Sequence, residues 1–283
     1  MTLEVLATGP LATVQDLGRP GLAGIGVGTS GAADASSLRL ANRLVGNDEN
    51  TAAIEVTFGG LVVRPTRDVT VALTGAPCPL SVDGRGAAAN AVLRVPAGAE
   101  LRLGVPAIGL RSYLAVRGGI DVAPVLGSRS TDVLSGLGPD QLRPGAALPI
   151  GAPPSRFPVV DIAPVAGPAE EVVLRVQPGP RADWFTDEAL ESLVSAPYEV
   201  TPESNRVGMR LDGPVLERSR TEELPSEGMV TGALQVPPLG TPTLFLADHP
   251  VTGGYPVIGV VLAADVAKAA QARPGQHVHF RCI

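Results

Sequence analysis

The chain has 283 residues, of which 45% are hydrophobic and only 18% are charged, and its net charge is −6. A mainly disordered chain is excluded, because disorder requires low hydrophobicity and high charge, and the acidic balance argues against nucleic acid or an anionic membrane as a partner. The 34 glycines and 28 prolines are roughly twice their usual share and follow no fixed period, which indicates many turns between short strands.

In the first half, the pattern predicts one helix and several short strands. Residues 34–45 place Leu38, Ala41 and Leu44 on one helical face, and Asp34 is suited to cap the helix N-terminus. Alternating or continuous apolar residues over strand lengths predict strands at 69–73, 91–95, 100–103 and 111–116.

The second half follows a proline-rich segment at 151–167, which is typical of an extended linker because proline cannot join the interior of a sheet. We therefore expect an N-terminal β-rich subdomain at 1–150, a linker at 151–169 and a C-terminal β-rich subdomain at 170–283. The predicted helices are 186–194 and 265–272, capped by Thr186 and Asp265, and the predicted strands are 172–177, 243–246, 257–262 and 277–281.

The fold class follows from the order of these elements. Strands outnumber helices and do not alternate regularly with them, which disfavours a doubly wound parallel sheet. The sequence predicts a mainly β protein with a few short helices, built as a barrel or a sandwich.

The segment richest in polar side chains is 247–256, which lies between two apolar strands. Asp248, His249, Thr252 and Tyr255 supply four kinds of reactive group, and Gly253 and Gly254 allow a ligand to approach the backbone closely. The alternative interpretation is an ordinary polar hairpin loop.

Three other segments carry candidate binding groups. Guanidinium groups bind carboxylates and phosphates, so Arg206 and Arg210 are candidates, although pairing with Glu203 and Asp212 is the simpler use. Ser226 and Glu227 precede a flexible glycine. The hydroxyls in 127–131 could bind an anion or cap a helix; these belong to Ser128, Ser130 and Thr131.

Several chemistries are missing from the sequence. The three histidines form no HExxH motif and no Cys/His cluster, so we predict no metal site built from them. No Gly-Lys pair exists, which removes a Walker-type phosphate loop. Without a signal-peptide pattern or an apolar run of about 20 residues, the sequence predicts a cytoplasmic protein.

An ordered set of motifs nevertheless resembles one family over nearly the whole chain. The motifs are VQDLGRPG (14–21), SGAAD (30–34), ANRLVGN (41–47), LTGA (73–76), YLAVRGG (113–119), GSRST (127–131), NRVGMRL (205–211), SEG (226–228), QVP (235–237) and DHPVTGGY (248–255). The chain resembles the family of the 5-oxoprolinase C subunit, also called allophanate hydrolase subunit 2 or the biotin-dependent carboxyltransferase family.

The resemblance implies a cyclophilin-like β-barrel architecture and work in a heteromeric complex. Its partners would be the 5-oxoprolinase B subunit, also called allophanate hydrolase subunit 1, and the 5-oxoprolinase A subunit. The complex would be an ATP-dependent amide (lactam) hydrolase that opens 5-oxo-L-proline to L-glutamate. Two alternatives remain open: a carboxyltransferase component of a biotin-dependent urea carboxylase, and a non-enzymatic antagonist of a kinase inhibitor.

The implied chemistry assigns roles to the candidate residues. A lactam is resonance-stabilised, and phosphorylation of its carbonyl oxygen would activate it, a step that needs positioning and charge neutralisation. Asp248 or Glu227 would act as base or hold magnesium alongside ATP, and Arg206 and Arg210 would hold anionic oxygens. The remaining expected contacts to substrate or nucleotide are Ser226, Gln235, Thr252, Gly253, Gly254, Tyr255, Ser128, Ser130 and Thr131.

Overall fold

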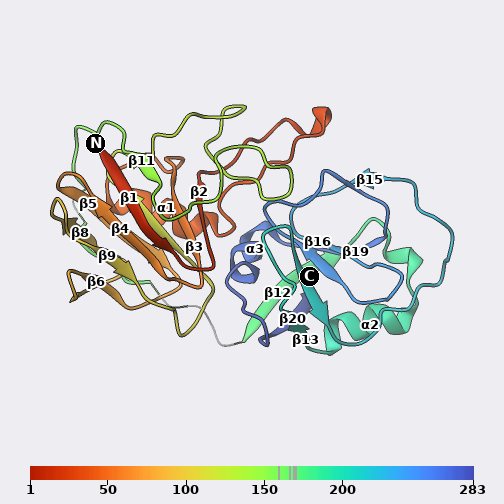
Figure 1. Cartoon of the computed structure of the whole chain (residues 1–283). Coiled ribbons are helices and arrows are strands. Elements are labelled where there is room, and N and C mark those ends of the chain that lie inside the picture. The colour runs from red at the N-terminus through yellow and green to blue at the C-terminus, as the bar shows by residue number, and fades with distance from the viewer. Residues whose placement is uncertain (159, 166, 168–170) are drawn as a thin grey trace. The chain divides into compact units, whose positions relative to one another are not determined.

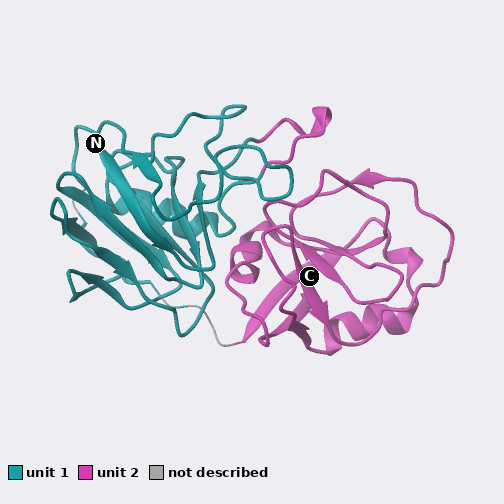
Figure 2. Cartoon of the chain, viewed as in Figure 1, with its two compact units in different colours: residues 1–19, 30–168 teal, residues 20–29, 169–283 magenta. Residues whose placement is uncertain are grey.

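The computed structural model describes residues 1–158, 160–165, 167 and 171–283. The chain divides into two compact units, one formed by residues 1–19 and 30–168 and the other by residues 20–29 and 169–283 (Figure 2). The chain thus contributes to the second unit twice, first through a short early segment that the sequence does not predict. The predicted linker, 151–169, contains residues 159, 166, 168 and 169, which lie outside the described residues.

The first unit contains two antiparallel sheets (Figure 1). The six-stranded sheet has the order β11 (Ala147–Pro149), β1 (Thr2–Thr8), β4 (Leu61–Pro65), β9 (Leu101–Leu103), β6 (Leu80–Val82) and β7 (Arg85–Ala87). The five-stranded sheet has the order β2 (Leu11–Gln15), β3 (Ala53–Thr57), β10 (Arg111–Val116), β5 (Val69–Gly75) and β8 (Val92–Val95).

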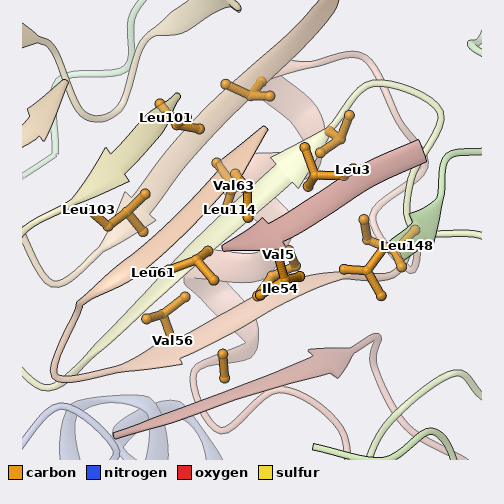
Figure 3. Packing of buried hydrophobic residues seen from close by; sticks show 14 of the residues in the cluster. Leu3, Val5, Ile54, Val56, Leu61, Val63, Leu101, Leu103, Leu114 and Leu148 are labelled. Carbon is orange, nitrogen blue, oxygen red and sulfur yellow. The ribbon is translucent and has the colours of Figure 1, made fainter. Parts of the chain in front are cut away.

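Apolar side chains from both sheets form one core between them. Leu61 and Val63 of β4 come from the first sheet, while Ile54 and Val56 of β3 come from the second, and all four are fully buried. Figure 3 shows these side chains packed together with Leu3 and other core residues. The alternation of β4 and β3 places every second side chain in this layer, as expected for sheets that pack face to face.

Helix α1 (Ala35–Leu44) covers the other face of the five-stranded sheet. Its buried side chains Leu38, Ala41 and Leu44 pack with Tyr113 and Ala115 of β10. The predicted cap is confirmed, since the Asp34 carboxylate accepts a hydrogen bond from the Ser37 amide at 3.0 Å.

Two connecting segments cover the outer strands of the five-stranded sheet. Along β2, the amides of Thr131 and Leu142 donate to the carbonyls of Val14 and Ala12. On the other side of the sheet, the amide of Val92, the first residue of β8, donates to the Asp161 carbonyl. In the six-stranded sheet, the outer strands β11 and β7 have three residues each.

The second unit contains a closed barrel of seven strands (Figure 1). Around the barrel the strands are β12 (Val172–Pro178), β19 (Val257–Val261), β16 (Ala233–Gln235), β17 (Thr243–Phe245), β14 (Gly208–Asp212), β13 (Tyr198–Val200) and β20 (His277–Cys282). β12 and β20 run parallel and close the ring. A mainly β fold with short helices and a barrel is therefore confirmed, with the barrel formed by the second half of the chain.

Two helices pack on this barrel and share its apolar core. α2 (Asp187–Ser195) begins after Thr186, whose hydroxyl accepts the Ala189 amide at 3.2 Å, as predicted. α3 (Ala263–Ala269) begins two residues earlier than predicted, after Leu262. Asp265 is consequently a first-turn residue rather than the cap.

The Asp265 carboxylate binds two cations instead. It accepts hydrogen bonds from the Arg175 side chain at 2.7 and 3.0 Å and lies 2.8 Å from Lys268 Nζ. Its side chain is 1% exposed, whereas those of its two partners are about half exposed. Arg175 first, and then Lys268, hold the pKa of this carboxyl well below its ordinary value despite burial.

This arrangement predicts an acid-sensitive contribution to stability. A carboxyl with a lowered pKa in the folded protein stabilises it above the unfolded value of about 3.9 and loses that contribution as the pH falls through the folded value. Asp265→Asn is expected to cost about 1–2 kcal/mol at pH 7, allowing for solvent screening of the two cations, and to flatten the loss of stability below about pH 4. Urea unfolding from pH 2 to 7 measures both effects, with the exposed Glu199→Gln as control. An unchanged pH profile would contradict the assignment.

None of the helices in the described ranges combines the length and apolar character that crossing a membrane requires.

Candidate functional site

Two short strands of the second unit bring together motifs that lie about 25 residues apart. β15 (Glu227–Gly228) pairs antiparallel with β18 (Thr252–Gly253), so that Glu227 lies opposite Gly253 and Gly228 lies opposite Thr252. Nearby, the Met229 amide donates to the Val251 carbonyl at 2.8 Å and extends this pairing. The ladder joins two of the segments that the sequence predicted separately, and we use it as the centre of the candidate site.

Gly253 lies against the side chain of Gln235, at the end of β16. A Cβ added at Gly253 would lie 2.5 Å from Gln235 Nε2, so a larger residue would push this amide aside. Gln235 Nε2 also donates to the Tyr255 carbonyl at 3.2 Å. Three predicted contact residues are thus held together. The second glycine of the motif, Gly254, is exposed, and a Cβ added there would meet only the Leu224 carbonyl oxygen, at 3.8 Å.

The carboxylate of Glu227 is bound by a guanidinium group that sequence reasoning missed. Arg181 Nε donates to Glu227 Oε1 at 3.0 Å and to Oε2 at 3.2 Å, and Arg181 Nη2 also contacts Oε1. The hydrogen bonds from Arg181 are the main reason why the pKa of Glu227 lies below its ordinary value. A carboxylate of lowered pKa is a weak base, so Glu227 is better suited to hold Arg181 and to supply fixed negative charge than to accept a proton.

Asp248 and Arg206, predicted to act separately on a ligand, are bound to each other. Arg206 Nε donates to Asp248 Oδ2 at 2.8 Å and Nη2 donates to Oδ1 at 3.0 Å. Both side chains are 0% exposed. In this arrangement the pair is a bidentate, fully desolvated ion pair inside the second unit, and the Asp248 carboxylate faces the Arg206 guanidinium.

The other predicted contacts of the second unit are exposed. Arg210 occupies an outward position of β14, while Arg206 is buried, so the two guanidinium groups do not converge on one partner. Thr252, in β18, and its neighbours Ser226 and Tyr255 all lie at the surface, and Tyr255 is 45% exposed.

The predicted residues of 127–131 lie in the first unit and surround a carboxylate of the chain. The hydroxyls of Ser128 and Ser130 each donate to Asp16 Oδ1 at 2.6 Å, and the Arg129 amide donates to Oδ2 at 2.6 Å. The Thr131 hydroxyl donates to the Pro139 carbonyl at 2.9 Å. In this turn, donors that the sequence offered for binding an anion surround the Asp16 carboxylate. Asp16 belongs to the VQDLGRPG motif, but nothing in the sequence indicated its contact with residues 128–130, more than 100 positions later.

The carboxylates that the sequence assigned to magnesium do not fit that role in this arrangement. Asp248 and Glu227 both have a guanidinium at hydrogen-bonding distance. Within the described part of the chain, no group of three or more His, Cys, Asp or Glu side chains could hold a metal ion without a ligand's help. We therefore derive no step through a metal ion bound by these two residues.

Comparison with known proteins gives a consistent set of relatives. A family profile described as "Carboxyltransferase domain, subdomain A and B" matches residues 25–282. The chain is 40% identical to the 5-oxoprolinase C subunit of Escherichia coli over 98% of its own length and 90% of that protein. It is 33% identical to urea amidolyase of Lachancea kluyveri, of which it spans 17%. The crystal structure of the K. lactis urea amidolyase matches the whole chain with a TM-score of 0.92 at 30% identity, and the chain spans 19% of that protein.

Proposed function

The chain belongs to the family of the carboxyltransferase domain, subdomains A and B, which includes the 5-oxoprolinase C subunit, and from this premise we propose that it is the C subunit of a 5-oxoprolinase. The observation that carries the proposal is the 40% identity to the E. coli protein, which extends over 98% of this chain and 90% of its relative. The complex would contain the A and B subunits as well, act in the cytoplasm and convert 5-oxo-L-proline to L-glutamate with ATP.

The residues of the β15–β18 ladder support a role in binding and charge neutralisation. ATP would supply a phosphoryl group to the lactam oxygen, and negative charge would then be spread over the phosphoryl oxygens. Arg181, oriented by Glu227, is a cation at the edge of the ladder. Gly254 is exposed and leaves room beside the backbone for a small ligand, since only the Leu224 carbonyl oxygen, at 3.8 Å, would lie near an added Cβ. The buried Gln235, against which Gly253 packs, donates to the Tyr255 carbonyl and fixes the turn that carries Tyr255.

The test of this function is reconstitution of the complex. Co-expressed with the A and B subunits from the same organism, the chain is expected to co-purify with the B subunit. The three proteins together should form glutamate from 5-oxoproline in an ATP-dependent reaction, and mixtures lacking this chain should not. Glutamate formation that proceeds equally well without the chain would contradict the proposal. So would a chain that does not associate with the B subunit in size-exclusion chromatography with light scattering.

A second function is favoured by the urea-metabolising relatives. The high TM-score to the K. lactis urea amidolyase supports a carboxyltransferase component that receives a carboxyl group from biotin on a separate carrier. Biotin- and bicarbonate-dependent carboxylation of urea, with no reaction on 5-oxoproline, would favour this function. Binding to the B subunit without any catalysis would instead favour the antagonist of a kinase inhibitor.

A further inference from the structure

Arg218 is a partly buried cation in the loop that follows β14. Phe185 and Arg218 form a β-bridge, and the Ser219 amide donates to the Trp184 carbonyl, so the loop is tied to residues 184–186. Arg218 Nη2 donates to the Val236 carbonyl. Its Nε is sealed from solvent and, in the part of the chain that the structure describes, has no hydrogen-bond partner.

Within the described part of the chain, Arg218 differs from the other arginines near the site because it forms no ion pair with a carboxylate. Arg181 is paired with Glu227, and Arg220 lies 3.0 Å from Asp183. Among the described residues, no carboxylate is paired with Arg218, whose interactions are the Val236 carbonyl and a nearby tyrosine ring. Burial lowers the pKa of Arg218 and outweighs the opposing effect of Tyr255. Desolvation of this guanidinium is therefore not offset by a paired carboxylate among the residues that the structure describes.

The position of Arg218 links it to the candidate site. Its Cζ lies 5.9 Å from the centre of the ring of Tyr255, a residue that is 45% exposed. Val236, which accepts its hydrogen bond, follows Gln235 in sequence, and the Val236 amide donates to the Pro256 carbonyl at 3.0 Å. Through Val236, the Arg218 guanidinium is therefore connected to the same backbone segments, 235–236 and 255–256, that hold Gln235 and Tyr255 in place.

We propose that Arg218 binds the oxyanion group of the small molecule that this site accepts, with the ring of Tyr255 beside it. The ligand chemistry is that of a compact oxyanion, either the carboxylate of the lactam substrate or a phosphate of the nucleotide. An anion placed against Arg218 would gain a charge-assisted hydrogen bond and would compensate the desolvated guanidinium. The choice between these two sources rests on the proposed function.

The experiment compares Arg218→Gln and Arg218→Lys with Arg281→Gln, which removes an exposed arginine of β20. In the assembled complex, KM is measured for 5-oxoproline and for ATP, and calorimetry measures direct binding of each. Arg218→Gln is expected to weaken one ligand about tenfold or more, with partial rescue by lysine, which keeps the charge but lacks the planar fork. Weaker binding of 5-oxoproline would show that Arg218 binds the carboxylate of the lactam. Weaker binding of ATP would show that it binds a phosphate of the nucleotide. The control is expected to match the wild type.

The outcomes separate the two proposals. A wild-type complex that forms no glutamate counts against the proposed function, while calorimetry still decides the role of Arg218. If Arg218→Gln assembles normally and binds both ligands within about twofold of the wild type, the role of Arg218 is overturned, since a lost charged contact should cost more. The role proposed for Arg218 is also overturned if the wild-type complex binds neither 5-oxoproline nor ATP.

Discussion

Asp248→Asn is expected to destabilise the second unit by about 3 kcal/mol or more. The substitution removes the charge that Arg206 faces, and both side chains are fully buried. Removing one member of a buried ion pair leaves the other as an uncompensated charge in a medium of low dielectric constant. Thermal and urea unfolding of the purified chain measure the loss. We therefore expect lost activity in this variant to follow lost stability, although the sequence assigned Asp248 a catalytic role.

The matched control removes both charges. A double variant, Arg206→Met with Asp248→Leu, leaves no buried charge, and we expect it to be more stable than either single variant. If Asp248→Asn unfolds like the wild type but the reconstituted complex is inactive, the structural interpretation of the pair is wrong and the catalytic role predicted from the sequence returns.

Asp16→Asn is expected to have the corresponding effect on the first unit, about 3 kcal/mol. The carboxylate accepts hydrogen bonds from two hydroxyls and from the amides of Gly18 and Arg129. An asparagine side chain has one acceptor oxygen, and its NH₂ group would face a donor. Ser128→Ala removes one of the four donors and is expected to cost about 1 kcal/mol. Equal effects of the two substitutions in urea unfolding would contradict the central role of Asp16.

Local signals in the sequence were sufficient for several elements. Asp34 and Thr186 cap their helices as predicted, because a capping side chain acts within three residues of its own position. Asp265 shows the limit of this reasoning. Asp265 also lies near a helix start, but its carboxylate is bound by Arg175, 90 residues earlier in the chain, and α3 begins at Ala263, before Asp265. Tertiary contacts overrode the local preference.

In the candidate site, too, the sequence indicated single motifs but not the contacts between them. Glu227 and Thr252–Gly253 were recognisable as short polar motifs, but only the fold places them opposite each other. Arg206 was expected to pair with nearby acids or with a ligand, and its partner is Asp248, 42 residues away. Arg181 and Arg218 lie in no recognisable sequence motif. Arg181 is distinguished by its ion pair with Glu227, which is distant in sequence, and Arg218 by the lack of a paired carboxylate among the described residues.

The covered outer strands of the first unit bear on its resistance to aggregation. An open sheet edge presents unpaired amides and carbonyls on which another chain can add a strand. In the five-stranded sheet, backbone donors or acceptors of β2 and β8 are already occupied by Thr131, Leu142 and Asp161. β7 is too short to offer a long template and begins with an exposed arginine, and β11 ends in a proline. Substitutions that loosen the segment 131–142, which Asp16 helps to hold through Ser130, would therefore expose a strand edge before they unfold the core.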